Sequence, residues 1–175
     1  MGLCFWFFDS DHTCNLSSHL QVFPPLSLDR AVFLAGSIDL GKSVDWQAEL
    51  NLFLADCPGI LLNPRRTQWD STWLPEASFP PFREQVQWEL DAMEAAGLIA
   101  FYFAPQSQAP VTLLELGLAA RGKKAVVCCP PGYWRKGNVD VVCEHYKIPM
   151  VPTLEDLAQK IRSYSMRDHG GKHRS

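Results

Sequence analysis

Short runs of consecutive apolar residues alternate along this chain with longer segments in which apolar residues recur at helical spacing. The short runs predict buried strands at residues 31–36, 60–63, 98–103, 124–129 and 148–151. The periodic segments predict helices at residues 44–56, 82–96, 110–121, 138–146 and 154–164. Five strands that are each followed by a helix are typical of an α/β protein.

This alternation also predicts how the elements are arranged. Because parallel strands are joined by right-handed crossovers, we expect a flavodoxin-like or Rossmann-like three-layer sandwich, with a five-stranded parallel sheet in the order 2-1-3-4-5. The domain is expected to cover residues 30–164. The polar, proline-interrupted sequence before it predicts an irregular N-terminal arm over residues 1–29, and the polar residues 165–175 predict a flexible tail.

One carboxylate stands inside an otherwise apolar helical run. Residues 110–121 read PVTLLELGLAAR, with Glu115 among them. An ionised carboxylate that is buried without partners is strongly destabilising, so Glu115 must be paired, lie at a cleft or serve in chemistry. The start of this helix is expected at the carboxyl edge of the sheet, where such folds bind ligands. Glu115 is therefore a candidate nucleophile, although an ion pair with Arg65, Arg66 or Arg121 would explain the same pattern.

Other polar residues are expected at the same edge. Gly36 and Ser37 end the first strand and offer backbone amides to a ligand, although a tight turn alone would also explain them. Asn138 starts the helix after the fourth strand, where it could bind substrate. Asp91 lies on the helix before the third strand, and its carboxylate either projects toward the expected crevice as a catalytic group or simply faces water.

The loop after the second strand is long for a compact domain. Residues 64–75 include two arginines and two tryptophans, and loops of this length are usually functional or disordered. Arg65 and Trp69 are candidates for substrate binding. Tryptophan can stack on a nucleobase, but such aromatic residues more often pack within loops and cores.

Composition narrows the function classes. A formal net charge of -3 argues against a nucleic-acid surface, so we expect a small-molecule partner. The six cysteines lack the spacing of a zinc site and indicate reduced thiols, as in the cytoplasm. The apolar residues 1–8 are too short to span a bilayer and lack the basic flank of a signal peptide, so no membrane anchor is expected. Nucleotide-loop and metal-hydrolase signatures are missing, and neither cofactor nor metal is expected.

Six motifs together resemble the nucleoside 2-deoxyribosyltransferase-like family, over residues 31–157. They are VFLAGSI at 32–38, LNPRR at 62–66, WDSTW at 69–73, FREQVQWELD at 82–91, PVTLLELG at 110–117 and WRKGNV at 134–139. The resemblance implies that Glu115 attacks C1′ of a 2-deoxyribosyl group and that Asp91 handles the base and its proton. It also implies that Asn138 positions the nucleophile or sugar, and that Gly36 and Ser37 lie where related deoxynucleotide hydrolases contact a 5′-phosphate.

The resemblance implies an N-glycosidic-bond enzyme for 2′-deoxyribonucleosides or their 5′-monophosphates. A covalent deoxyribosyl intermediate would lead to base exchange or to hydrolysis. The family also implies a homo-oligomer, a dimer or larger. Two positions depart from typical transferases, since Ala109 replaces an acidic residue and Val32 replaces a tyrosine. They leave open a second interpretation, a non-catalytic nucleoside or nucleotide sensor that retains the pocket.

Overall fold

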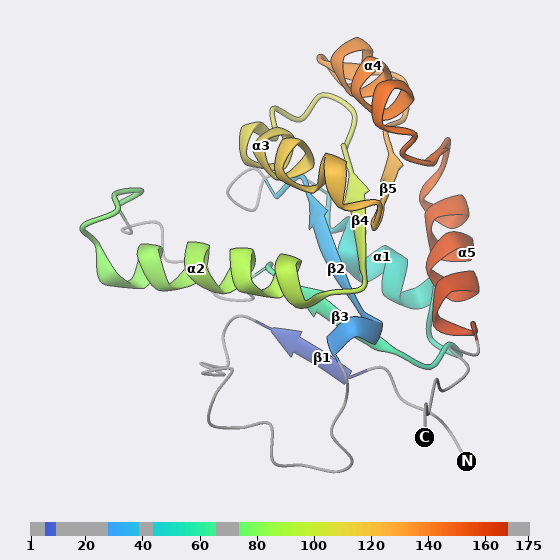
Figure 1. Ribbon diagram of the computed structural model, residues 1–175, viewed down its shortest axis with the longest axis horizontal. Coiled ribbons are helices and arrows are strands. Elements are labelled where there is room, and N and C mark those ends of the chain that lie inside the picture. The colour runs from blue at the N-terminus through green and yellow to red at the C-terminus, as the bar shows by residue number, and fades with distance from the viewer. Residues whose placement is uncertain (1–5, 10–27, 39–43, 66–73, 168–175) are drawn as a thin grey trace, which may run out of the picture.

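A six-stranded parallel sheet forms the centre of the molecule in the computed structural model (Figure 1). The structure describes residues 6–9, 28–38, 44–65 and 74–167. The strands are β1 (Trp6–Asp9), β2 (Ala31–Gly36), β3 (Ile60–Asn63), β4 (Leu98–Tyr102), β5 (Ala125–Cys128) and β6 (Met150–Val151). Their order is β1-β3-β2-β4-β5-β6, in which the last five strands confirm the predicted order 2-1-3-4-5.

Helices cover both faces of this sheet, which confirms the three-layer architecture (Figure 1). The helices are α1 (Trp46–Phe53), α2 (Pro80–Ala95), α3 (Pro110–Ala119), α4 (Lys136–Tyr146) and α5 (Leu154–Ser165), with short 3-10 turns η1 (Leu28–Arg30) and η3 (Ala120–Gly122). Alternate residues of each strand face opposite layers, so Phe33 packs under α2 and α3 while Leu34 packs against α1 and α5. None of the described helices is long and apolar enough to cross a membrane.

Strand β1 is an addition to the expected sheet. It lies within the segment for which we expected an irregular arm, and pairs in parallel with β3 from Trp6 opposite Ile60 to Asp9 opposite Asn63. Without β1, β3 would be an edge strand with unpaired backbone groups. The short apolar segment of β1 forms hydrogen bonds with these groups. The arm therefore contributes regular structure at one edge of the sheet.

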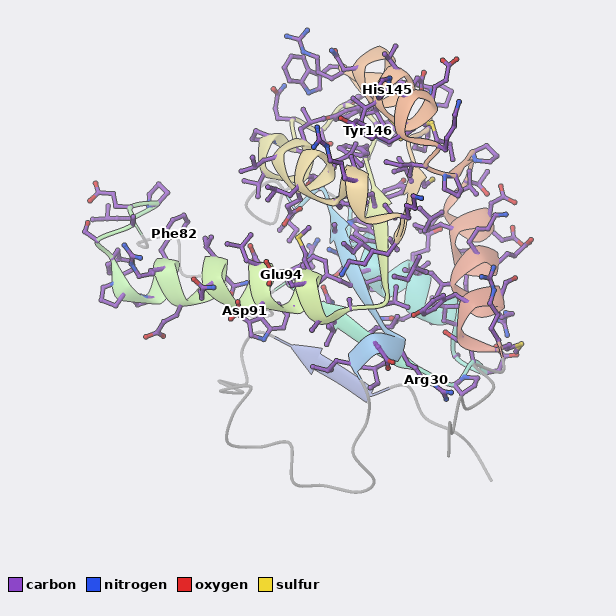
Figure 2. The ribbon with its side chains drawn as sticks, viewed as in Figure 1. Arg30, Phe82, Asp91, Glu94, His145 and Tyr146 are labelled. Atoms are coloured by element: carbon purple, nitrogen blue, oxygen red, sulfur yellow. The ribbon has the colours of Figure 1, made fainter. Side chains whose placement is uncertain are left out.

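Helix α2 places its buried face differently from the stripe of large apolar residues in its sequence. Met93 is buried, but Val86 and Leu90 are each more than a third exposed. The N-terminal part of α2 extends beyond the sheet, with Phe82 near its outer end (Figures 1 and 2). The buried face of α2 includes Gln85 and Ala92. This packing determines which residues of α2 face the candidate site.

Candidate active site

Glu115 lies in the second turn of α3, directly after the loop that follows β4. The N-cap residue Ala109 is in the left-handed conformation, with φ 42°, and Pro110 opens the helix, so the chain turns sharply before α3. The Glu115 side chain is partly buried. Burial, and secondly the neighbouring carboxylate of Glu89, raises the pKa of Glu115 to about 8. The carboxyl group is therefore largely protonated at neutral pH in the ligand-free protein.

The second carboxyl group at this place comes from α2. Glu89 is partly buried, and it is close enough to Glu115 to raise its pKa by repulsion. The buried amide of Gln85, one turn earlier, donates from Nε2 to Glu89 Oε1 over 2.7 Å and to the Pro64 carbonyl over 3.4 Å. Gln85 thus ties Glu89 to the chain just after β3, and two carboxyl groups are held in one region.

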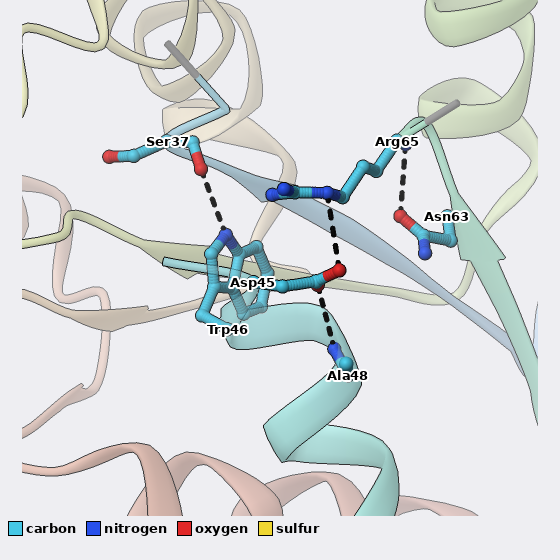
Figure 3. Close-up of polar contacts among 6 residues, drawn as sticks. All are labelled: Ser37, Asp45, Trp46, Ala48, Asn63 and Arg65. Atoms are coloured by element: carbon cyan, nitrogen blue, oxygen red, sulfur yellow. Dashed lines mark hydrogen bonds and ion pairs between the residues drawn. The ribbon is translucent and has the colours of Figure 1, made fainter. Parts of the chain in front are cut away.

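Gly36 ends β2, and Ser37 follows it in closely packed surroundings. A Cβ on Gly36 would lie 2.5 Å from the ring of Trp46, a distance that real side chains do not show. Ser37 is fully buried, and its Oγ lies 2.6 Å from Ser107 Oγ and accepts the Ala104 N–H over 3.1 Å. The Ser37 carbonyl accepts from Trp46 Nε1 over 3.1 Å (Figure 3). These bonds join the end of β2 to the loop after β4.

Arg65 follows β3 and reaches toward the start of α1 (Figure 3). Its Nε lies 3.3 Å from Asp45 Oδ2, while the other oxygen of Asp45 caps α1 by accepting the Ala48 N–H over 3.0 Å. The Arg65 backbone N–H donates to Asn63 Oδ1 over 3.0 Å. Its Nη1 is buried without a hydrogen-bond partner among the described residues. Arg65 therefore keeps donor capacity at the carboxyl edge.

The remaining predicted residues are Asp91, Asn138 and Trp69. Asp91 is exposed on α2, and its Oδ1 accepts from Gln87 Nε2 over 2.8 Å (Figure 2). Asn138 is an exposed residue in the first turn of α4. Trp69 lies outside the described residues. The binding roles of Asn138 and Trp69 and the catalytic role of Asp91 stay predictions.

Two aromatic side chains after β5 are fixed against the loop after β4. Tyr133 is buried and donates from its hydroxyl to the Gln108 carbonyl over 3.1 Å, and Trp134 Nε1 donates to the same carbonyl over 3.1 Å. The Trp134 side chain is half exposed, and the Arg135 guanidinium lies 4.1 Å from its ring centroid. An oriented aromatic surface is thus available near this edge of the sheet.

Glu89 is the residue that the sequence pattern did not single out. Its neighbours on the buried face of α2 are Gln85, Ala92 and Met93, which recur at helical spacing. Because this face consists largely of small and polar residues, a search for large apolar residues alone does not reveal it. A stripe at positions 85, 89, 92 and 96 was the available signal, because residue 96 is a further buried alanine.

Within residues 6–9, 28–38, 44–65 and 74–167, no three side chains of His, Cys, Asp or Glu gather in a geometry that could hold an ion. The described cysteines, Cys57, Cys128, Cys129 and Cys143, are free thiols and all buried. The groups available at the candidate site are therefore carboxyl, amide, guanidinium and aromatic.

Comparison with known proteins assigns the chain to a family. The sequence profile described as nucleoside 2-deoxyribosyltransferase like matches residues 29–133, which is more than half of the chain. This segment includes Glu115, Glu89, Asp91 and Arg65, and it extends to the start of the aromatic turn after β5. A search of curated proteins finds no significant match. The chain belongs to the nucleoside 2-deoxyribosyltransferase-like family.

Proposed function

We propose that this protein cleaves the N-glycosidic bond of 2′-deoxyribonucleosides or their 5′-monophosphates, with Glu115 as the nucleophile. The observation that carries the proposal is a partly buried Glu115 whose pKa is raised to about 8 beside a second carboxyl group, that of Glu89. Paired carboxyl groups with shifted pKa values are typical of sites for glycosidic-bond chemistry. The family assignment supports the same class of substrate.

In the first step, a carboxylate oxygen of Glu115 forms a bond to C1′ while the bond from C1′ to the base nitrogen breaks. The electron pair of that bond leaves with the base, which takes up a proton from an acid. The transition state resembles an oxocarbenium ion, and a covalent deoxyribosyl ester on Glu115 results. In the second step, a new base or a water molecule attacks C1′ and releases the Glu115 carboxylate.

The proton for the departing base must come from a neighbouring group. We propose that Glu89 supplies it, because Glu89 and Glu115 interact and Gln85 orients the Glu89 carboxyl group. A pair that shares one proton can hold it on Glu89 while Glu115 is ionised for attack. Asp91 is the alternative acid that the sequence predicts. Comparing the activities of Glu89→Gln and Asp91→Asn decides between the two residues.

Substrate binding is proposed to involve Arg65, Asn138, Gly36, Ser37 and Trp69. Arg65 is the most specific of these, because its Nη1 is a buried donor without a hydrogen-bond partner in the described structure. A phosphate oxygen would satisfy that donor well, since guanidinium groups bind phosphate in a fixed fork geometry. Gly36 and Ser37 would act through the backbone at the end of β2, because the Ser37 hydroxyl is already engaged.

Assembly into a homodimer or larger oligomer is also proposed. Helix α3 exposes Val111, Leu114 and Leu118, each of which is more than half exposed in the single chain. Side chains of this kind on one helix favour burial against a second copy. Light scattering coupled to size-exclusion chromatography measures the state directly, and a monomer at micromolar concentration would overturn this point.

The deciding experiment incubates the protein with each 2′-deoxyribonucleoside and each 5′-monophosphate, with and without a second free base. Base released in the absence of a second base identifies hydrolysis, and a new nucleoside formed in its presence identifies transfer. Intact-mass measurement of a rapidly quenched reaction should detect one deoxyribosyl group on the wild type and none on Glu115→Ala. Thermal stabilisation by nucleotides without any product would instead favour the sensor.

A further inference from the structure

A cavity of about 270 Å³ lies at the amino edge of the sheet, where β4 and β5 begin. Leu98, Val126 and Pro149 provide apolar parts of its wall, and Lys160 and Tyr164 of α5 provide another side. A single buried water needs only about 10–15 Å³ of such volume, so this cavity has room for an organic ligand. It is at the opposite end of the strands from the loops next to Glu115.

Cationic side chains dominate the polar lining of this cavity. Lys123, Lys124, Lys160 and Arg167 contribute to it, and no carboxylate lines it among the described residues. The chain as a whole has a net charge of -3, so the concentration of positive charge here is local. No ion pair involves these four side chains within the described parts of the chain. The charged groups of Lys123, Lys160 and Arg167 are therefore available to an anion.

Lys124 is held in place by the end of α2. Its Nζ donates to the carbonyls of Met93, Glu94 and Ala96 over 2.8, 2.8 and 2.9 Å. These bonds use its donors but leave its positive charge uncompensated by a direct ion pair. Glu94, which is exposed, interacts with Lys124 only at longer range. Lys124 thus acts as a fixed charge in the wall rather than as a mobile side chain.

The part of the lining formed by Gly97 and Tyr164 is also closely packed. The Tyr164 hydroxyl donates to the Asp29 carbonyl over 2.7 Å, and Gly97 lies against both groups. A Cβ on Gly97 would overlap the Asp29 carbonyl oxygen at 1.8 Å. Near Tyr164, the exposed Asp29 carboxylate and the Arg30 guanidinium beside it carry opposite charges. The cavity therefore has a preformed wall, and the four cationic side chains of its lining give it a net positive charge.

We propose that this cavity is a second ligand site, separate from the candidate active site, that binds a compact organic polyphosphate such as a nucleoside di- or triphosphate. Several phosphoryl charges match several cations in one recess, whereas one inorganic ion would use only part of the volume. The apolar wall formed by Leu98, Val126 and Pro149 gives the rest of the ligand a surface to contact. A nucleic-acid strand fits less well, because the positive charge is confined to the recess of an acidic protein.

Isothermal titration calorimetry with the full chain tests this site. The probes are adenosine triphosphate, inorganic tripolyphosphate and inorganic phosphate at fixed ionic strength. We expect the triphosphates to bind and inorganic phosphate to bind at least about tenfold more weakly, because it engages fewer of the cations. Tighter binding of the nucleotide than of tripolyphosphate would identify a nucleotide as the ligand, and equal binding would identify the polyphosphate group alone.

The variant Lys123→Ala/Lys160→Ala should weaken triphosphate binding by about tenfold or more, since it removes two charges from the recess. Both lysines are exposed, so the fold should persist, and circular dichroism checks this. Lys147→Ala removes one exposed charge at the end of α4 and should leave binding unchanged. No triphosphate binding at millimolar concentration, or an equal loss in Lys147→Ala, would overturn the site. The result is independent of whether deoxynucleosides are cleaved.

Discussion

The two edges of the sheet hold charge in opposite ways. At the carboxyl edge, Glu115 and Glu89 are two neighbouring carboxyl groups in a partly buried region, and burial together with the Glu89 carboxylate raises the pKa of Glu115 to about 8. At the amino edge, Lys123 and Lys160 are exposed like charges that water screens. The partly buried pair of carboxyl groups retains a proton, which suits proton transfer. The exposed lysines stay charged, which suits attraction of an anion. The difference between these edges can be tested by changing one group at a time.

The largest expected effect is the loss of turnover in Glu115→Gln. Because the amide cannot form the glycosyl ester, kcat should fall by about a thousandfold or more. Steady-state release of free base from a deoxynucleoside measures this. Glu144→Gln, which changes an exposed glutamate of α4 in the same way, serves as the matched control. Retention of wild-type kcat in Glu115→Gln would show that the carboxyl edge does not take part in the reaction.

Glu89→Gln should lower kcat by about a hundredfold, the usual size of a general-acid contribution. In the wild type, kcat/KM should also fall above about pH 8, where the pair loses the proton that the departing base must receive. Asp91→Asn, made in parallel, should cost less because Asp91 is exposed and bonded to Gln87. A greater loss in Asp91→Asn would assign the acid to Asp91 instead.

The stability of the protein should depend on pH through Glu115. Its folded pKa is raised above the ordinary value of 4.5, so between about pH 5 and pH 8 the folded protein holds a proton that the unfolded chain releases. The free energy of unfolding should therefore fall as pH rises through this window, by about 1.4 kcal/mol per pH unit. Urea unfolding of wild type and Glu115→Gln measures the slope, and the variant should lack this contribution. Equal slopes in the two proteins would show that Glu115 is not held protonated.

The smallest expected effect concerns Arg65. Replacing it with methionine keeps much of its length but removes the buried donor, so KM for a 5′-monophosphate should rise by about tenfold. KM for the corresponding nucleoside should change much less. Initial rates with the two substrates measure the ratio. An equal change for both would show that Arg65 supports the site through its contact with Asp45 rather than through phosphate.

The strand order was predictable because continuous apolar runs, such as that of β5, must be buried on both faces. Strand β1 was not, since pairing of a four-residue segment depends on the open edge that β3 presents. Glu115 was predictable as an isolated acid in an apolar helix. Glu89 was not, because the phase of α2 is set by tertiary packing of Gln85 and Ala92 rather than by its large apolar residues.

The amino-edge cavity was equally hidden in the sequence. Lys123 and Lys124 precede β5, whereas Lys160 and Arg167 lie on or after α5. Separately, each is an ordinary polar residue at the surface of a helix or turn. Only the packing of α5 across the starts of β4 and β5 brings their charges together. A charge pattern of this kind has no local sequence signature.

The Ser37–Ser107 contact has a consequence for the motion of the loop after β4. The Ala104 amide hydrogen is bonded to the fully buried Ser37 hydroxyl, so it can exchange with solvent only when that contact opens. Opening would separate two buried hydroxyl groups and expose the end of β2 as well. The loop that leads to α3 is therefore tied to the end of β2, and hydrogen exchange at the Ala104 amide would report how often this contact opens.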